Sequence, residues 1–323
     1  MPGEDATEQP LMPRSSAPQV WTATVAETKF YWYDLLVEGG PLPDFRDPIG
    51  RYLRRMQFAI DGTMEKRLLY FLVARPRVRF DLQRSVSWSF FSLKLTIPVL
   101  IGADERKSTI TIDLDVPFEA TYKKPLVQVQ DKFLLLNWGA LVETLSIHDL
   151  IQRYDTGLAF PGTVLYVGQT HDPAGKLAKG QHAPVNRARN AAMLDSDVFL
   201  LIQRFDVKVD TTATDLSEEA STRTHTDMIE GALIGYFESD DSRLRTEIER
   251  GNRRDHLADL QFTYFLQKLT VDLGFEGANG FYDLESPQAG LSRRHLFECT
   301  FEAGRPVIRR LPDNARPLPS LSG

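Results

Sequence analysis

The stretch Thr109-Ile110-Thr111-Ile112-Asp113-Leu114-Asp115-Val116 alternates apolar and polar side chains without a break. Successive side chains of a strand point to opposite faces, so this alternation predicts a half-buried strand with its even-numbered residues on one face. Upstream, two alternating runs of opposite phase meet at Phe90-Phe91, and we interpret the phase change as a β-bulge. Residues 85–101 and 109–118 are therefore predicted to form an antiparallel hairpin.

The same period of two dominates the chain from about Val20 to Trp138. It predicts further strands at 20–26, 29–37, 68–74, 77–82 and 125–136. Prolines separate many of these segments, as is usual for turns between strands. Residues 19–138 are accordingly predicted to form an antiparallel β domain with little helix.

After Trp138 the apolar period changes, and strands and helices mix. Ser146-Ile147-His148-Asp149 has the pattern of a capping box that opens a helix. Further along, the pattern predicts strands at 163–167, 197–209, 295–301 and 307–310, and helices at 173–181, 184–194, 228–237, 242–250 and 256–273. The predicted fold class is therefore α+β, with a small mixed α/β domain over 139–311. Residues 1–18 and 312–323 are predicted to be disordered tails.

Composition restricts the function classes. The 323 residues suit about two domains, and their formal net charge of −6 excludes a uniformly basic nucleic-acid coat. The single cysteine, Cys299, excludes an internal disulfide and a cysteine zinc cluster, and it favours a reducing compartment. No apolar run approaches the roughly 18 residues of a membrane span, so we expect a cytoplasmic protein without a membrane partner.

One segment carries a chemical pattern. In Thr163–Thr170, a strand rich in β-branched residues leads into Tyr166, Gly168 and Gln169. The end of such a strand would present the tyrosine hydroxyl in a cleft, and the glycine would allow a close approach of another group. Basic and polar residues follow, then an apolar strand, and then a carboxylate in the helical pattern 228–237. The residues after the strand that carry this pattern are Lys176, His182, Arg187 and Glu230.

This succession resembles the GIY-YIG endonuclease superfamily, above all its divergent bacterial members, over roughly residues 160–245. The resemblance implies that Tyr166 positions or deprotonates the attacking water and that Glu230 holds Mg²⁺ or another divalent cation. It also implies that Lys176, or Arg187 or Arg189 from the next helix, neutralises charge on the phosphate, with His182 close to the same phosphate. The partner implied is nucleic acid, either DNA or RNA.

Two functions stay open at this point. The first is a metal-dependent endonuclease in which the β domain recognises the target or contacts a protein partner or a second copy of the chain. The second is a catalytically inactive GIY-YIG-like module that binds nucleic acid or another protein. The second is favoured by the lysine at the family's arginine position, and by Tyr154 being the only tyrosine shortly upstream of Tyr166. Five arginines against two glutamates between 242 and 254 favour a phosphate-rich partner in either case.

Overall fold

The computed structural model describes residues 17–38, 44, 46–61, 68–158, 160–170, 183–192, 195–211, 222–238, 245–275 and 280–312. Residues 1–16 and 313–323, most of the two predicted tails, and the predicted helix at 173–181 lie outside these ranges. No helix within them is long and apolar enough to cross a membrane. The secondary structure is mixed α/β, as the sequence predicts.

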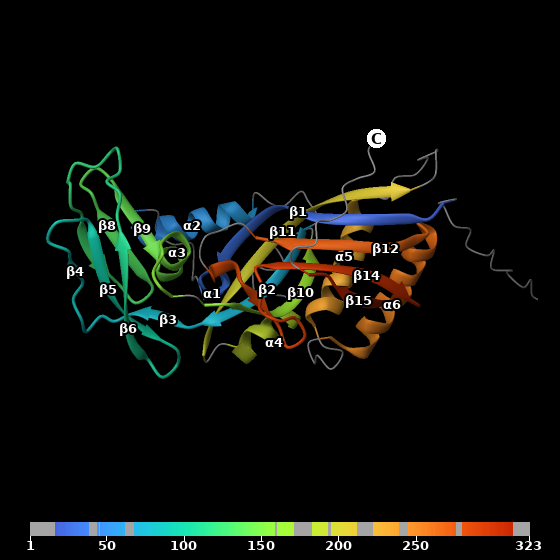
Figure 1. Ribbon diagram of the computed structural model, residues 1–323. Coiled ribbons are helices and arrows are strands. Elements are labelled where there is room, and N and C mark those ends of the chain that lie inside the picture. The colour runs from blue at the N-terminus through green and yellow to red at the C-terminus, as the bar shows by residue number, and fades with distance from the viewer. Residues whose placement is uncertain are drawn as a thin grey trace, which may run out of the picture.

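An eight-stranded sheet forms the larger part of the molecule (Figure 1). Its strand order is β13-β10-β2-β11-β1-β12-β14-β15, with mostly antiparallel neighbours. The exceptions are the parallel pairs β1–β12 and β10–β13. Its strands are β1 (Gln19–Trp32), β2 (Leu68–Pro76), β10 (Gly162–Thr170), β11 (Ser196–Thr211), β12 (Leu266–Gly274), β13 (Leu284–Glu285), β14 (Arg294–Glu302) and β15 (Arg305–Arg310).

Two smaller sheets form the other end of the molecule, at the left of Figure 1. One contains β3 (Val78–Phe80), β4 (Ser87–Trp88), β5 (Lys94–Ile101) and β6 (Arg106–Asp113), and the other β7 (Leu126–Val129), β8 (Phe133–Asn137) and β9 (Val142–Ser146). The predicted hairpin is confirmed in β5 and β6, whose residues pair from Lys94–Asp113 to Ile101–Arg106. Ile110, Ile112 and Leu114 are buried as predicted, whereas Val116 lies beyond the strand and is exposed.

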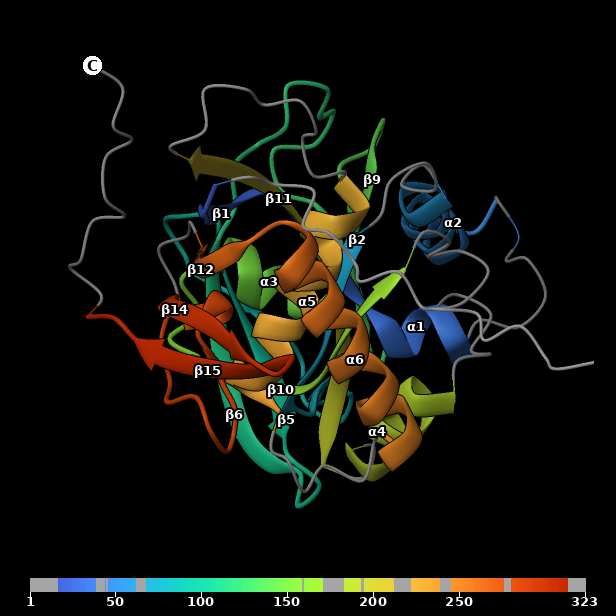
Figure 2. The ribbon, with the colours of Figure 1, turned by 90° about the vertical axis from the view of Figure 1, so that its right-hand side faces the viewer.

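The helices are α1 (Tyr33–Glu38), α2 (Pro48–Asp61), α3 (Ile147–Arg153), α4 (Ala183–Ala192), α5 (Thr222–Phe237) and α6 (Glu247–Thr263), with a short 3₁₀ turn at Gly280–Tyr282. The capping box of Ser146 and Asp149 opens α3 as predicted. The large sheet curls around α5, which contacts β2 and β10 on one side and β12 and β15 on the other. Figure 2 looks at the molecule from this end and shows α5 and α6 beside strands β12, β14 and β15.

The large sheet contains strands from both sides of the predicted boundary at Trp138. β1 and β2 come from the 19–138 segment, yet they lie between strands of the 139–311 segment. A single cluster of buried apolar residues also extends through both segments. In addition, α1 and α2 give the first segment more helix than predicted, and α1 replaces the end of the strand expected at 29–37.

The predicted helix at 256–273 is wrong in its second half. α6 ends at Thr263, Phe265 has a φ of 47°, and the chain continues as strand β12. The predicted helical stripe included Phe262 and Phe265, but both are half exposed. The buried residues of β12, Leu269, Val271 and Leu273, instead follow the period of two of a strand between two others.

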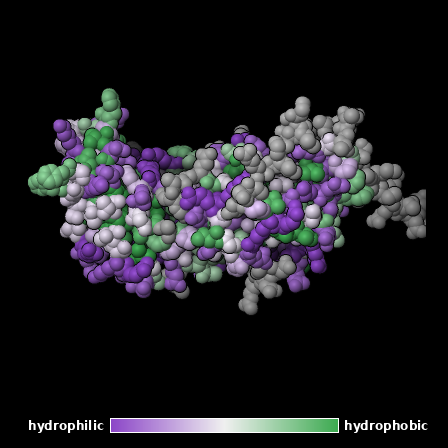
Figure 3. Space-filling model, viewed as in Figure 1, coloured by the Kyte–Doolittle hydropathy of each residue, from purple (hydrophilic) through white to green (hydrophobic). Residues whose placement is uncertain are grey.

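The predicted bulge at Phe90-Phe91 is also wrong. The Ser89 amide donates to the Lys94 carbonyl, and Trp88 pairs with Leu95, so the chain reverses direction between β4 and β5. The phase of the alternation changes because two strands meet at a turn. Both phenylalanine side chains are almost fully exposed, and the hydropathy surface of Figure 3 shows hydrophobic protrusions at this end of the molecule.

Candidate functional site

Two tyrosines lie on neighbouring strands of the large sheet. Tyr70 is on β2 and Tyr166 on β10, and their ring centroids are 6.0 Å apart. Both side chains are buried, with 1% and 4% of their surface exposed. Gly168 pairs with Tyr70 in the antiparallel register. A Cβ atom at Gly168 would lie 2.6 Å from the Tyr70 hydroxyl oxygen and 2.8 Å from Cε1 of Tyr166, so the glycine lets the two rings occupy this space.

Substituting Gly168→Ala should therefore displace both tyrosine rings. Overpacking a well-filled interior costs about 1–3 kcal/mol, and we expect a loss of this size in the free energy of unfolding. Chemical denaturation followed by circular dichroism measures it. Gly251→Ala is a useful control because nothing lies within 4 Å of an added Cβ there. An alanine at 168 that leaves stability unchanged would contradict the close packing of the two rings.

Two carboxylates from α5 lie beside this strand pair. Asp227 and Glu230 are three residues apart on the helix and therefore share a face. The side-chain amide of Gln169, on β10, donates to both: Nε2 lies 2.7 Å from Oδ1 of Asp227 and 3.0 Å from Oε2 of Glu230. From α6, Arg253 lies 3.5 Å from Oε1 of Glu230, and His256 lies 3.1 Å from Oδ2 of Asp227. Gln169 thus connects the strand of Tyr166 to both carboxylates.

Glu230 lies in an unusual electrostatic environment for a helix carboxylate. Only 6% of the residue is exposed, and most of its neighbours on α5 are apolar. Burial raises the pKa of Glu230, and although Arg253 and Arg245 oppose the change, the net direction is upward. A carboxyl group whose charge is disfavoured by burial is typical of functional sites, although structural ion pairs produce it as well.

Both tyrosine hydroxyls remain protonated at neutral pH. Burial is the main reason that the pKa of Tyr166 and that of Tyr70 are raised, and the negative charge of Glu230 raises each of them further. The hydroxyls are therefore hydrogen-bond donors and acceptors here, and they are poor sources of a phenolate base.

Arg245 fixes the Tyr166 side chain. Its guanidinium group lies 4.3 Å from the centre of the Tyr166 ring, and its Nη1 donates to the hydroxyl at 3.1 Å. The same group donates to the carbonyl of Val167 and to both carboxylate oxygens of Glu238, at 2.8 Å each. Glu238 in turn accepts from the Val167 amide at 2.9 Å. Arg245 and Glu238 therefore bind the edge of β10 next to Tyr166, beyond the two residues that pair with β13.

The structure places the predicted site residues as follows. Tyr166 and Glu230 lie within electrostatic range of each other, and Gln169 on the strand of Tyr166 bonds to Glu230. Arg187 is exposed on α4. Near the start of α6, the hydrogen bond from the Thr246 amide is the main cause that lowers the pKa of Glu249, and the charge of Arg187 adds to it. Lys176 and His182 lie outside the described residues. Arg189 belongs elsewhere: its Nε lies 2.7 Å from Oδ1 of Asp34, so it does not reach into this site.

Several residues of the cluster were missed in the sequence. Tyr70 lies on a buried strand far upstream of the window in which a partner for Tyr166 was sought, and Tyr154 is the C-cap of α3. Asp227 could have been found from its spacing of three from Glu230 on one helix. The other missed residues are Gln169, Arg245, Arg253 and His256.

The donor set suits a hard cation only in part. Within the described ranges, no three histidine, cysteine or acidic side chains gather closely enough to hold a metal ion. Two carboxylates one helical turn apart do fit Mg²⁺, which usually takes one or two protein carboxylates and fills its other positions with water and phosphate. Glu230 and Asp227 would be these ligands.

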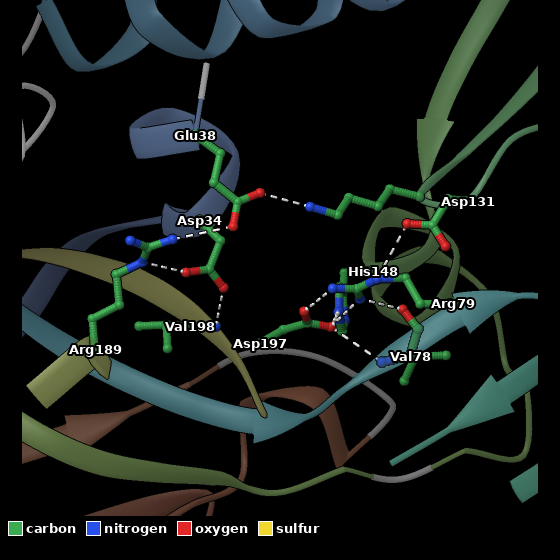
Figure 4. Close-up of polar contacts among 10 residues, drawn as sticks. Asp34, Glu38, Val78, Arg79, Asp131, His148, Arg189, Asp197 and Val198 are labelled. Carbon is green, nitrogen blue, oxygen red and sulfur yellow. Dashed lines mark hydrogen bonds and ion pairs between the residues drawn. The ribbon is translucent and has the colours of Figure 1, made fainter. Parts of the chain in front are cut away.

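A second polar cluster, shown in Figure 4, lies where the large sheet meets the smaller ones. Asp197, on β11, binds the Arg79 guanidinium through both oxygens at 2.8 Å and His148 at 2.7 Å. It also accepts from the Val78 amide at 3.1 Å. Asp34 similarly joins Arg189 and the Val198 amide, at 2.7 Å each. These carboxylates are buried and occupied by arginine and backbone donors, so this cluster is structural.

No family model, no curated protein and no solved structure matches the chain.

Proposed function

We propose that the protein is a metal-dependent nuclease that hydrolyses a phosphodiester bond of DNA or RNA. The observation that carries this proposal is that Glu230, on α5, lies within electrostatic range of both Tyr70 on β2 and Tyr166 on β10, since its charge raises the pKa of each hydroxyl. The resemblance to GIY-YIG endonucleases supports it, since that family pairs two strand tyrosines with a helix glutamate. In this proposal β2, β10 and β11 with α4 and α5 form the GIY-YIG-like unit, and the segment from β3 to α3 is an insertion between its first two strands.

The chemistry assigns a role to each group. Glu230, assisted by Asp227, would hold Mg²⁺, which supplies a positive charge that stabilises the phosphate as bonds change. The protonated hydroxyls of Tyr70 and Tyr166 would orient the attacking water through hydrogen bonds. Arg253 is suited to bind a phosphate oxygen, because its Nη1 has no hydrogen-bond partner in the described part of the chain.

The alternative is a nucleic-acid-binding module without catalysis, and one observation favours it. Glu230 is deeply buried and accompanied by Arg253, which already balances its charge. If that ion pair persists when nucleic acid binds, no cation would replace it.

The direct test is cleavage of labelled single-stranded DNA, duplex DNA and RNA by the full chain, with Mg²⁺ or with a chelator. We expect cleavage only with the metal, and we expect Tyr70→Phe and Tyr166→Phe each to slow it by about 10²-fold or more, since positioned proton-handling groups contribute about 10²–10⁴. Only a hydroxyl is removed, so the fold should persist.

Tyr264→Phe is the matched control, because Tyr264 is also buried but lies at the end of α6 beside Trp21. Binding of these nucleic acids without hydrolysis, whichever divalent ion is supplied, would select the binding module. Undiminished cleavage by both tyrosine variants would remove the tyrosines from the mechanism.

A further inference from the structure

A cavity of about 700 Å³ lies between the N-terminal half of α5 and strands β2 and β11. Its volume is within the roughly 300–1,000 Å³ of small-molecule sites in proteins. Leu69 and Ile229 supply apolar walls, and Gln203, Arg204, Arg223 and His225 supply polar ones.

This cavity adjoins the candidate site. Leu69 pairs with Gln169 on one side and with Gln203 on the other, so these three side chains form one cross-strand row. Gln169 binds both carboxylates, and Gln203 lines the cavity. On α5, the cavity-lining Ile229 directly precedes Glu230. The cavity is therefore next to the carboxylate pair of Asp227 and Glu230, separated from it by the side chains of Leu69 and Ile229.

The polar groups of the cavity suit a nucleotide. Gln203 is fully buried, and its Oε1 has no hydrogen-bond partner among the described residues, while its Nε2 lies 3.5 Å from Oγ1 of Thr28. A buried amide acceptor of this kind is satisfied by an N–H group such as those on nucleobase edges. Of the two arginines among the lining residues, Arg204 is paired with Glu27 at 3.8 Å, whereas Arg223 is exposed on the first turn of α5 and is the one suited to a phosphate.

We propose that this cavity is a nucleotide subsite that takes one unpaired nucleotide of the substrate, next to the scissile phosphate. The inference rests on the proposed nuclease function for the identity of its substrate. The base would enter between Leu69 and Ile229 and bond to Gln203, and the sugar-phosphate would lie at Arg223. A base enclosed between a helix and a sheet cannot keep its pairing partner, so the substrate is single-stranded or locally unpaired nucleic acid.

The test is equilibrium binding of the full chain, without divalent ions, to a single-stranded oligonucleotide that contains 2-aminopurine, and to the corresponding duplex. We expect tighter binding of the single strand, with a change in 2-aminopurine fluorescence. Gln203→Leu, which nearly keeps the side-chain volume, should weaken single-strand binding by about tenfold, because a base N–H is left unpaired. Arg223→Ala should weaken it too, whereas Arg305→Ala, an exposed arginine on β15, should not.

Equal binding of single strand and duplex, or full affinity in Gln203→Leu, would overturn the subsite. A mononucleotide that binds as tightly as the oligonucleotide would overturn it as well, because the cavity would then serve a free nucleotide. Selective single-strand binding that depends on Gln203, in a chain that cleaves nothing with Mg²⁺, would uphold the subsite and refute the nuclease proposal.

Discussion

Replacing Glu230 by glutamine is expected to slow metal-dependent cleavage by about 10²–10³-fold, the usual cost of removing one electrostatic stabiliser from an active site. We expect the same substitution to leave the thermal midpoint equal to or above that of the unchanged chain. Burial raises the pKa of Glu230. The folded chain therefore holds this proton more tightly than the unfolded chain, and the free energy of unfolding falls as the pH rises through the pKa range.

Charged Glu230 thus costs stability at neutral pH, and the neutral amide removes that cost. Differential scanning calorimetry at pH 7 and a cleavage assay on the same preparation measure the two effects together. Glu247→Gln is the control, since Glu247 is an exposed carboxylate in the first turn of α6. A marked fall in the midpoint of Glu230→Gln would show that Glu230 is a structural partner of Arg253.

Local patterns in the sequence indicated two residues of the candidate site, but they did not indicate which distant segments of the chain lie beside them. Tyr166 and Glu230 follow short-range patterns, a strand ending in Tyr-Val-Gly and an apolar helix with one carboxylate. Tyr70 could not be found in this way, because the pairing of β2 with β10 is decided by tertiary packing across a long intervening segment. Spacing along the chain indicates which face of an element a residue occupies, but not which strand is its neighbour.

The fold was predicted to a similar extent. Alternation predicted β5, β6 and, in the large sheet, β1 and β2, and the capping box predicted the start of α3. Strands were also predicted where β10, β11, β14 and β15 lie. The apolar residues of β12 fit both a helical period and a period of two. Over so short a run, periodicity alone does not distinguish a helix from a strand. The position of the strand between β1 and β14 decided the outcome. Tertiary packing also decides that β1 and β2 lie in one sheet with strands from the second half of the chain. The change of period at Trp138, from which the boundary was predicted, carries no information on this pairing.

The buried cluster around Asp197 should determine how firmly the two ends of the molecule are joined (Figure 4). Asp197→Asn keeps the shape of the side chain but removes the buried negative charge that faces Arg79 and His148. Arg79 then keeps only its longer contact with the exposed Asp131, at 3.5 Å. Removing one partner of a buried ion pair costs about 3–5 kcal/mol, and we expect a loss of this size in the free energy of unfolding, measured by urea denaturation at pH 7. Asp210→Asn, on the same strand but half exposed beside Lys208, should change it by less than about 1 kcal/mol.

The pH dependence of stability separates this charge effect from a simple packing defect. Burial alone would raise the pKa of Asp197, but hydrogen bonds and charges from His148 and Arg79 outweigh it and hold the pKa well below its usual range. The stability that the carboxylate contributes is therefore complete above about pH 4, the ordinary value for aspartate, and it decreases as the pH falls toward the lowered pKa. Asp197→Asn lacks this dependence, so its unfolding free energy should approach that of the unchanged chain below pH 4. A difference that stays constant from pH 7 to pH 3 would mean that the asparagine acts through altered packing and not through the lost charge.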